Sequence, residues 1–254
     1  MATAPAHLRD VAATDGGRFA AVAAAVTALA ATLALGVGVL TPPRGGVLCT
    51  SGCIPYPYTA AAPYVAADSV WIYPAIVMVL GFVAVAASLH GLAAPARRAP
   101  ALGALALSAI AAALLVGDYG VHLMVVVPSL AKGEGADVTL LSMYNPHGVF
   151  IALENAGYFT LGLAFLAAGM AIPGGGRLGR AARWTFLAAG GLAVGGLAVL
   201  GLSFGTDLDV RYEVFAISVD YLALIVGGAL LAGLFATGRA RQEAPATPHD
   251  RENR

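Results

Sequence analysis

Three acidic residues stand inside long apolar stretches of this 254-residue chain: Asp118, Glu154 and Asp220. A charged side chain at the centre of a membrane-spanning helix costs about 2.5–3.5 kcal/mol on insertion scales, so such residues are candidates for function. At a helical rise of about 1.5 Å per residue, they lie roughly 14, 9 and 12 Å from the same membrane face. A shared polar cavity open to that face requires such a common depth.

Polar neighbours at helical spacing extend this acidic set. His122 follows Asp118 by four residues, which places both side chains on one helix face. His147, Glu154 and Tyr158 have the i, i+7, i+11 spacing of a second face. Asn155 lies beside one of the acids and Tyr221 beside another, while Trp71 and Tyr73 are expected at the rim. The predicted ligand or ion pocket comprises Asp118, His122, His147, Glu154, Asn155, Tyr158 and Asp220.

Three interpretations of this set are open. Carboxyl groups inside a membrane can exchange protons or bind a cationic or polyol-like ligand. Carboxylate and imidazole together also suit a divalent metal, but HExxH and other tight ligand motifs are absent, so no metal site is predicted. In the third interpretation the residues only make interhelical hydrogen bonds that hold the helices together. The residues alone do not choose among these interpretations.

Two cysteines, Cys49 and Cys53, are separated by three residues in a loop that contains Ser51 and Gly52. We predict a structural disulfide between them, because disulfides persist outside the cytoplasm. A redox pair acting on a quinone or thiol is the alternative, although CxxC is the more typical spacing for it. The CxxCH motif of covalently attached haem is absent.

The composition defines the class of protein in which these residues act. Hydrophobic residues make up 59% of the chain and charged residues 11%, against about 25% charged in ordinary soluble domains. Disorder of the whole chain and a water-soluble enzyme are therefore both excluded. With 14 basic and 14 acidic residues, the chain lacks the basic surface of a nucleic-acid-binding protein. A polytopic membrane protein, in contact with the lipid bilayer, is indicated.

Six apolar stretches are long enough to cross a bilayer as helices, each needing about 20 residues. We predict an all-α fold with one six-helix transmembrane domain in residues 1–238, followed by a disordered cytoplasmic tail in residues 239–254. Asn145 and Pro146 have the residue types of an N-cap and a first helical position, so they are expected to begin the fourth helix. The predicted spans are Phe19–Leu40, Val70–Leu92, Ala101–Val127, Gly148–Ile172, Trp184–Phe204 and Tyr212–Ala236.

The basic residues predict the orientation of these spans. Eleven of the 14 flank the helices on the side of the two termini, and only Arg44, Lys132 and Arg211 fall on the other side. By the positive-inside rule, both termini lie in the cytoplasm. The first span is longer than the apolar region of a signal peptide, so we expect it to be retained, although a cleaved five-helix form stays open.

The fifth predicted span is rich in glycine. Gly191 and Gly195 form one small-xxx-small pair, and Gly201 and Gly205 form another. Such spacing lets helix backbones approach closely in lipid. We expect these pairs to pack inside the bundle, or alternatively to form the interface of a homo-oligomer.

Four segments resemble a family of uncharacterised multi-helix membrane proteins of bacteria and archaea, over roughly residues 70–172. The segments are WIYPA (Trp71–Ala75), DYGVHLMVVVPSL (Asp118–Leu130), KGEG (Lys132–Gly135) and LLSMYNPHGVFIALENAGY (Leu140–Tyr158). The resemblance implies an integral protein of a prokaryotic plasma membrane, with no assigned activity. It also implies that relatives often carry Gln in place of His122, which favours a hydrogen-bonded acidic site over metal chemistry.

The leading functional hypothesis is that the chain binds or transports a small solute, proton or ion through an outward-facing acidic pocket. Here Asp118 and Glu154 carry the charge exchange, while His122, His147 and Tyr158 position the ligand. One alternative is a membrane-embedded enzyme that acts on a lipid or quinone at the outer leaflet. Another is a non-catalytic accessory or assembly protein. Whether the chain is an enzyme, and which cofactor or ligand it takes, are left open.

Overall fold

The computed structural model describes residues 6–243, with the backbone alone for residues 6–14, 135–136 and 238–243. Within the described part, every regular element is helical, and the predicted all-α fold is confirmed. Residues 244–254 of the predicted tail lie outside the described residues, and residues 239–243 continue the last helix. The α-helices are α1 Ala6–Leu40, α2 Val65–Asp68, α3 Ile72–Leu92, α4 Arg98–Val121, α5 Val127–Ala131, α6 Val149–Ala171, α7 Gly176–Phe204 and α8 Arg211–Glu243.

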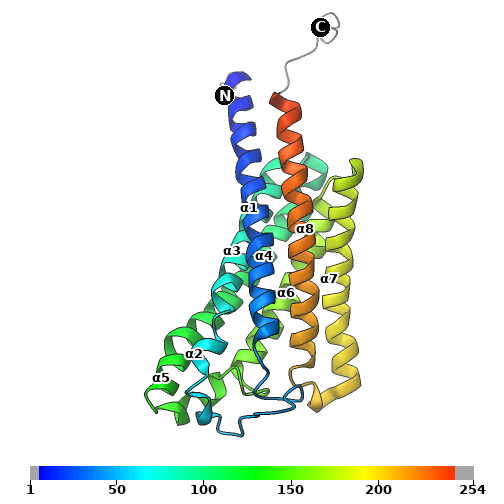
Figure 1. Cartoon of the computed structure of the whole chain (residues 1–254). Helices are drawn as coiled ribbons and strands as arrows, with labels where there is room; N and C mark the ends of the chain where they lie inside the picture. Colours follow the sequence, from blue (N-terminus) through cyan, green and yellow to red (C-terminus); the bar gives the residue numbers. More distant parts are fainter. Residues whose placement is uncertain (1–5, 244–254) are drawn as a thin grey trace, which may run out of the picture.

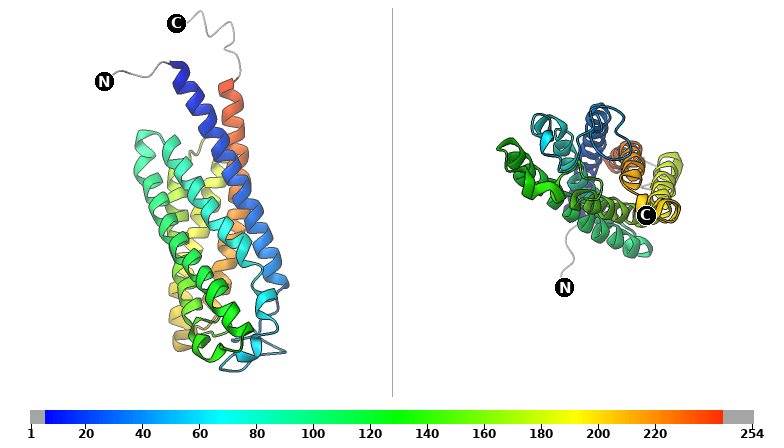
Figure 2. Two further views of the ribbon diagram at one scale, coloured as in Figure 1. Left: turned by 90° about the vertical axis from the view of Figure 1, so that its left-hand side faces the viewer. Right: turned by 90° about the horizontal axis from the view of Figure 1, so that it is seen from below.

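Six helical segments in the described residues are long and apolar enough to cross a membrane, as predicted. They alternate in direction, so α1 and α8 carry the two chain ends to the same end of the bundle (Figure 1). We call the opposite end the distal end; residues 41–71, 127–148 and 205–211 form it. The connections there are long enough to fold over the helix ends (Figure 2).

Several helices extend beyond their apolar stretches. The fifth span was expected to begin at Trp184, but α7 begins at Gly176 and includes Arg177, Arg180 and Arg183. Arginine and alanine both favour helix, so the end of the hydrophobic run does not end the helix. Hydropathy marks the membrane-embedded part of each helix rather than its ends.

The third span changes its helical period near the distal end. After α4, residues His122–Val126 form one π-helical turn, and α5 continues to Ala131 with Pro128 in its first turn. The extra residue in the π turn rotates the following segment relative to α4, a feature found often at functional sites. His122 stands at the start of this turn, and its side chain is fully buried.

The prediction that Asn145 and Pro146 begin the fourth helix was wrong, because α6 starts at Val149 with Gly148 as its N-cap. Asn145 instead holds the turn before the helix. Its side-chain oxygen accepts a hydrogen bond from the His147 main-chain N–H (3.0 Å), and its carbonyl accepts one from Gly148 (2.9 Å). Asn is favoured in such side-chain-to-backbone turns as well as at N-caps, so residue type alone does not separate the two.

Helix α6 lies centrally and packs against α4, α7 and α8, while α1 packs against α3 and α8. The right-hand view of Figure 2, taken from the distal end, looks along the helices of this bundle. At the level nearer the termini, three fully buried rings meet: Phe82, Phe165 and Phe186, with centroid separations of 5.1–5.8 Å. They fill the interior of the bundle between the distal half and the end that carries the termini.

The expected packing of the α7 glycine pairs inside the bundle was wrong for Gly191, Gly195 and Gly201. A Cβ at any of these positions meets nothing within 4 Å. The close approach of α6 and α7 occurs one residue earlier, at Gly190, where a Cβ would meet Leu166 and the carbonyl of Gly162. A glycine does allow close packing on this helix, but at a position one residue away from the predicted pair. Adjacent residues of a helix point about 100° apart, so the predicted glycines face away from α6.

Candidate functional site

A chain of hydroxyl groups leads through the distal half of the bundle to Glu154. The Tyr119 hydroxyl donates to Glu154 Oε1 at 2.8 Å and lies 2.6 Å from the Tyr158 hydroxyl, which lies 3.0 Å from that of Tyr221. Because each hydroxyl has one proton, Tyr221 donates to Tyr158 and Tyr158 to Tyr119. All four side chains are buried. The chain therefore delivers its protons toward Glu154 and leaves Tyr221 free to accept a hydrogen bond.

Glu213, on the first turn of α8, joins this cluster from the other side. Its carboxyl group is within hydrogen-bonding reach of the Glu154 carboxyl group. One oxygen of each, Glu154 Oε2 and Glu213 Oε2, is buried and has no hydrogen-bond partner outside the pair. Two carboxylates so close in an apolar setting cannot both be ionised, so the pair holds at least one proton.

Sequence reasoning missed Glu213. It lies one residue inside the predicted sixth span, and we counted only Asp118, Glu154 and Asp220 as buried acids. Its spacing carried a signal, because Glu213 and Asp220 are seven residues apart and Glu213 and Tyr221 are eight, which places them near one face of a helix.

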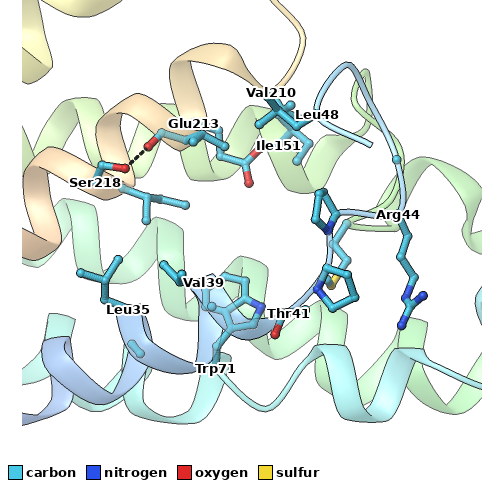
Figure 3. A pocket seen from close by; sticks show the side chains of 18 of the residues that line it. Leu35, Val39, Thr41, Arg44, Leu48, Trp71, Ile151, Val210, Glu213 and Ser218 are labelled. Carbon is cyan, nitrogen blue, oxygen red and sulfur yellow. Dashed lines mark hydrogen bonds between the residues drawn. The ribbon is translucent and has the colours of Figure 1, made fainter. Parts of the chain in front are cut away.

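Glu213 of this pair lines a cavity of about 330 Å³ at the distal end. Figure 3 shows the carboxyl group of Glu213 directed into this cavity, with Trp71 on the opposite side. The lining is mostly aliphatic, from the end of α1 and the start of α8. Its polar lining groups include Glu213, Tyr221, Tyr144, Thr41, Ser218 and Arg44.

A loop formed by residues 41–58 covers the cavity and is held at several points. On one side, Arg44 Nε donates to Asp68 Oδ2 at 2.7 Å, and the Tyr144 hydroxyl donates to the same oxygen at 2.9 Å. On the other side, the Val47 N–H donates to Asp209 Oδ2 at 3.2 Å. The bond to Asp68 raises the pKa of Arg44, and burial raises the pKa of Tyr144, so both keep their protons at neutral pH.

The predicted disulfide lies in this covering loop. Cys49 and Cys53 are bonded, with their Cα atoms 5.8 Å apart. Leu48, directly before the bridge, lines the cavity. The bridge closes a short ring beside the cavity and shortens the free length of the loop.

Asp118 and His122 are both buried in the third span, but they do not line the cavity. Ser69 donates its hydroxyl proton to the Val65 carbonyl (2.6 Å), so His122 Nε2 donates to Ser69 Oγ (3.0 Å). His122 Nδ1 and Asp118 Oδ2 have no hydrogen-bond partner. The ring of His122 packs on Phe150, with centroids 5.0 Å apart.

The other predicted site residues are dispersed. His147 is exposed at the distal end, and Asn155 is half-buried on α6 beside Glu154. Asp220 is fully buried on α8 with both carboxyl oxygens unpartnered, but it does not line the cavity. Of the seven predicted residues, Glu154 and Tyr158 are joined through the hydroxyl of Tyr119, and the other five lie outside that chain of hydrogen bonds.

Toward the end that carries the termini, this cluster is followed by the buried aromatic group. Phe165 follows Tyr158 by seven residues on α6, which places it about 10 Å farther from the distal end. There it meets Phe82 and Phe186 in the buried aromatic group. Within the described residues, no group of three His, Cys, Asp or Glu side chains is arranged to hold a metal.

The six apolar spans indicate an integral, multi-pass membrane protein. Its distal end holds a cavity that is lined by one member of a buried acid pair. Comparison of the chain with protein-family models, curated proteins and solved structures finds no match. The function must therefore be argued from the site itself.

Proposed function

We propose that this protein binds a small solute in the distal cavity and that binding exchanges a proton with the Glu154–Glu213 pair. The observation that carries the proposal is the position of Glu213, which lines the cavity and at the same time reaches a fully buried second carboxyl group. A solute that contacts Glu213 necessarily changes the interaction that holds the shared proton.

The acid pair favours this function over a purely structural role. A structural cluster would satisfy its buried groups with ordinary donors, because an unsatisfied buried acceptor costs about 1–3 kcal/mol. Glu154 Oε2 and Glu213 Oε2 have no hydrogen-bond partner outside the pair, so only the shared proton can satisfy them. Glu213 lines the cavity, where a ligand can reach it.

Binding is also favoured over catalysis by the lining of the cavity. A nucleophilic hydroxyl needs a neighbouring base to activate it. The aliphatic hydroxyls of the lining, Thr41 and Ser218, donate to main-chain carbonyls of Val37 and Val214. No histidine is among the lining residues. The arrangement suits recognition and proton exchange.

We propose further that the distal end faces the outside of a prokaryotic plasma membrane, with both termini in the cytoplasm. The support is the distribution of basic residues, 11 of 14 of which flank the spans on the side of the termini. In this orientation the cavity receives its solute from the outer side, and the aromatic group separates it from the cytoplasm.

A homo-oligomer through α7 is proposed as well, because Gly191 and Gly195 face open space on a membrane-spanning helix. Small residues at this spacing allow close helix contacts in lipid. Disulfide cross-linking of a Gly195→Cys variant in membranes is expected to give covalent dimers, whereas Leu80→Cys, exposed on α3, is not. Equal yields from the two variants would exclude this interface.

The binding proposal is tested by thermal unfolding of the purified protein against a panel of small solutes. A bound solute stabilises the folded protein and so raises its melting temperature. At a hundredfold excess of solute over Kd, the stabilisation is about 2.7 kcal/mol. We expect Glu213→Gln to remove such a shift and Asp220→Asn to keep it. Asp220 is the matched control, since it is a buried carboxyl on the same helix outside the cavity. A shift that Glu213→Gln leaves intact would reject the proposal.

A further inference from the structure

The distal cavity combines an acid pair, aromatic groups and an aliphatic lining, and we infer that its ligand is a small organic cation with an apolar body. This inference rests on the proposed function, and it assigns the chemical class of the solute. It is carried by three features of the cavity: its charges, its aromatic lining and the side on which its wall is exposed.

The charges of the cavity favour a cation. Within the described residues, Arg44 is the one basic residue that lines the cavity, and it is already paired with Asp68 at 2.7 Å. Figure 3 shows its guanidinium group directed away from the cavity. The lining therefore offers Glu213 no unpaired basic group, and a bound cation can supply the missing positive charge.

The groups around Glu213 do not supply that charge either. The titratable groups that act on Glu213 are Glu154 on α6, Asp118 on α4 and Asp209 before α8, all acidic. Tyr119, Tyr158 and Tyr221 are linked to Glu154 by their chain of hydroxyl groups and carry no positive charge. Without a ligand, protons alone can neutralise this cluster. A monovalent cation that enters the cavity displaces one of them.

The aromatic lining fits the same class of ligand. The indole of Trp71 lies across the cavity from Glu213, and the face of a tryptophan ring attracts cations within about 6 Å of its centre. Tyr221 contributes a hydroxyl whose proton is already donated to Tyr158. It presents an acceptor, which suits a cation and disfavours an anion.

The aliphatic part of the wall is exposed on the side of α1 and α8. Val39, Leu48 and Val214 line the cavity and are 75%, 43% and 42% exposed. Val39 and Val214 belong to membrane-spanning segments, so the exposed rim is apolar. A ligand with an apolar body is accommodated there, while its charge lies against Glu213.

The probe for this inference is benzyltrimethylammonium, with neopentylbenzene as its uncharged carbon analogue and phenylacetate as an anion. Binding is read from the fluorescence of Trp71 in a Trp184→Phe variant. The chain has two tryptophans, and Trp184 is 66% exposed on α7, away from the cavity, so this change isolates the reporter.

We expect the cation to bind with release of one proton, so that its affinity rises about tenfold per pH unit while the pair stays protonated. Glu213→Gln and Glu154→Gln are expected to weaken it at least tenfold and to remove the pH dependence. Asp220→Asn is expected to leave both unchanged. Glu213→Asp keeps a carboxyl group, so it is expected to retain proton release even if its affinity for the cation falls. This variant therefore distinguishes loss of the carboxyl group from loss of the fold.

The outcomes separate the ligand class from the proposed function. If neopentylbenzene or phenylacetate binds at least as tightly as the cation and depends on Glu213, the cavity is a binding site and the cationic class is wrong. The inference also fails if Glu213→Gln leaves the cation affinity unchanged. If none of the three probes gives a Glu213-dependent signal, the cationic class is rejected for this size of ligand, and the solute panel then decides the proposed function by itself.

Discussion

Glu213 and Asp220 differ in what surrounds them, although both are acids on α8 and lie seven residues apart. Glu213 reaches the cavity and the Glu154 carboxyl group, whereas both oxygens of Asp220 are buried without a partner. The two residues are similar in type, and their neighbours decide the role. We assign proton exchange to Glu213 and none to Asp220.

This contrast predicts a difference in stability between two substitutions. Asp220→Asn removes no hydrogen bond, so the free energy of unfolding is expected to change by about 1 kcal/mol or less. Tyr119→Phe removes the donor to Glu154 Oε1 and leaves that buried acceptor unsatisfied, at a cost of about 1–3 kcal/mol. Denaturant unfolding in detergent measures both. A larger loss for Asp220→Asn than for Tyr119→Phe would show that Asp220 has a partner in the folded protein.

At the scale of the helices, the contact of α6 with α7 depends on the absence of a side chain at Gly190. A Cβ there would meet Leu166 and the carbonyl of Gly162, whereas a Cβ at the next residue, Gly191, meets nothing within 4 Å. Since α6 carries both Glu154 and Tyr158, this contact also positions the site.

The two adjacent glycines therefore make a matched test. Gly190→Ala is expected to lower the free energy of unfolding by about 1–3 kcal/mol through overpacking. Gly191→Ala is expected to be neutral or stabilising, because alanine is the better helix former. Thermal unfolding of the two variants compares them directly. Equal losses would mean that the α6–α7 contact is not as close as described.

The helices could be predicted from the sequence, while most of the site could not. Length and apolar composition define a membrane span, and the six spans follow from them. Spans that are apolar on all sides give no signal for their rotation about their own axes. The meeting of Tyr119 and Tyr221 with Tyr158, and of Glu213 with Glu154, depends on that rotation. The pairing of Glu154 with Tyr158 on one face was predictable because both lie on the same helix.

For the whole molecule, the structure has two unlike ends. The end with the termini carries the arginines of the α3–α4 and α6–α7 connections, and the distal end carries the disulfide and the cavity. This asymmetry is the basis of the proposed orientation. In it the cavity opens outward, and the buried phenylalanines close the bundle between the cavity and the end that carries the termini.

The orientation predicts which positions react with a membrane-impermeant maleimide on intact cells. Lys132→Cys at the distal end is expected to be labelled, and Gly175→Cys in the α6–α7 connection only after the membrane is permeabilised. Both positions are exposed, and the native cysteines are bonded to each other, so they do not compete. Labelling of Gly175→Cys in intact cells, without labelling of Lys132→Cys, would reverse the orientation.

The central claim is that Glu213 is a protonated carboxyl group accessible from an apolar cavity, and its reaction with dicyclohexylcarbodiimide in native membranes tests this most directly. The reagent adds to protonated carboxyl groups that it can reach from an apolar phase, and peptide mass spectrometry locates the adduct. We predict an adduct on Glu213 and none on Asp220, which is a buried carboxyl on the same helix but does not line the cavity. An unmodified Glu213, or equal modification of the two residues, would contradict the account.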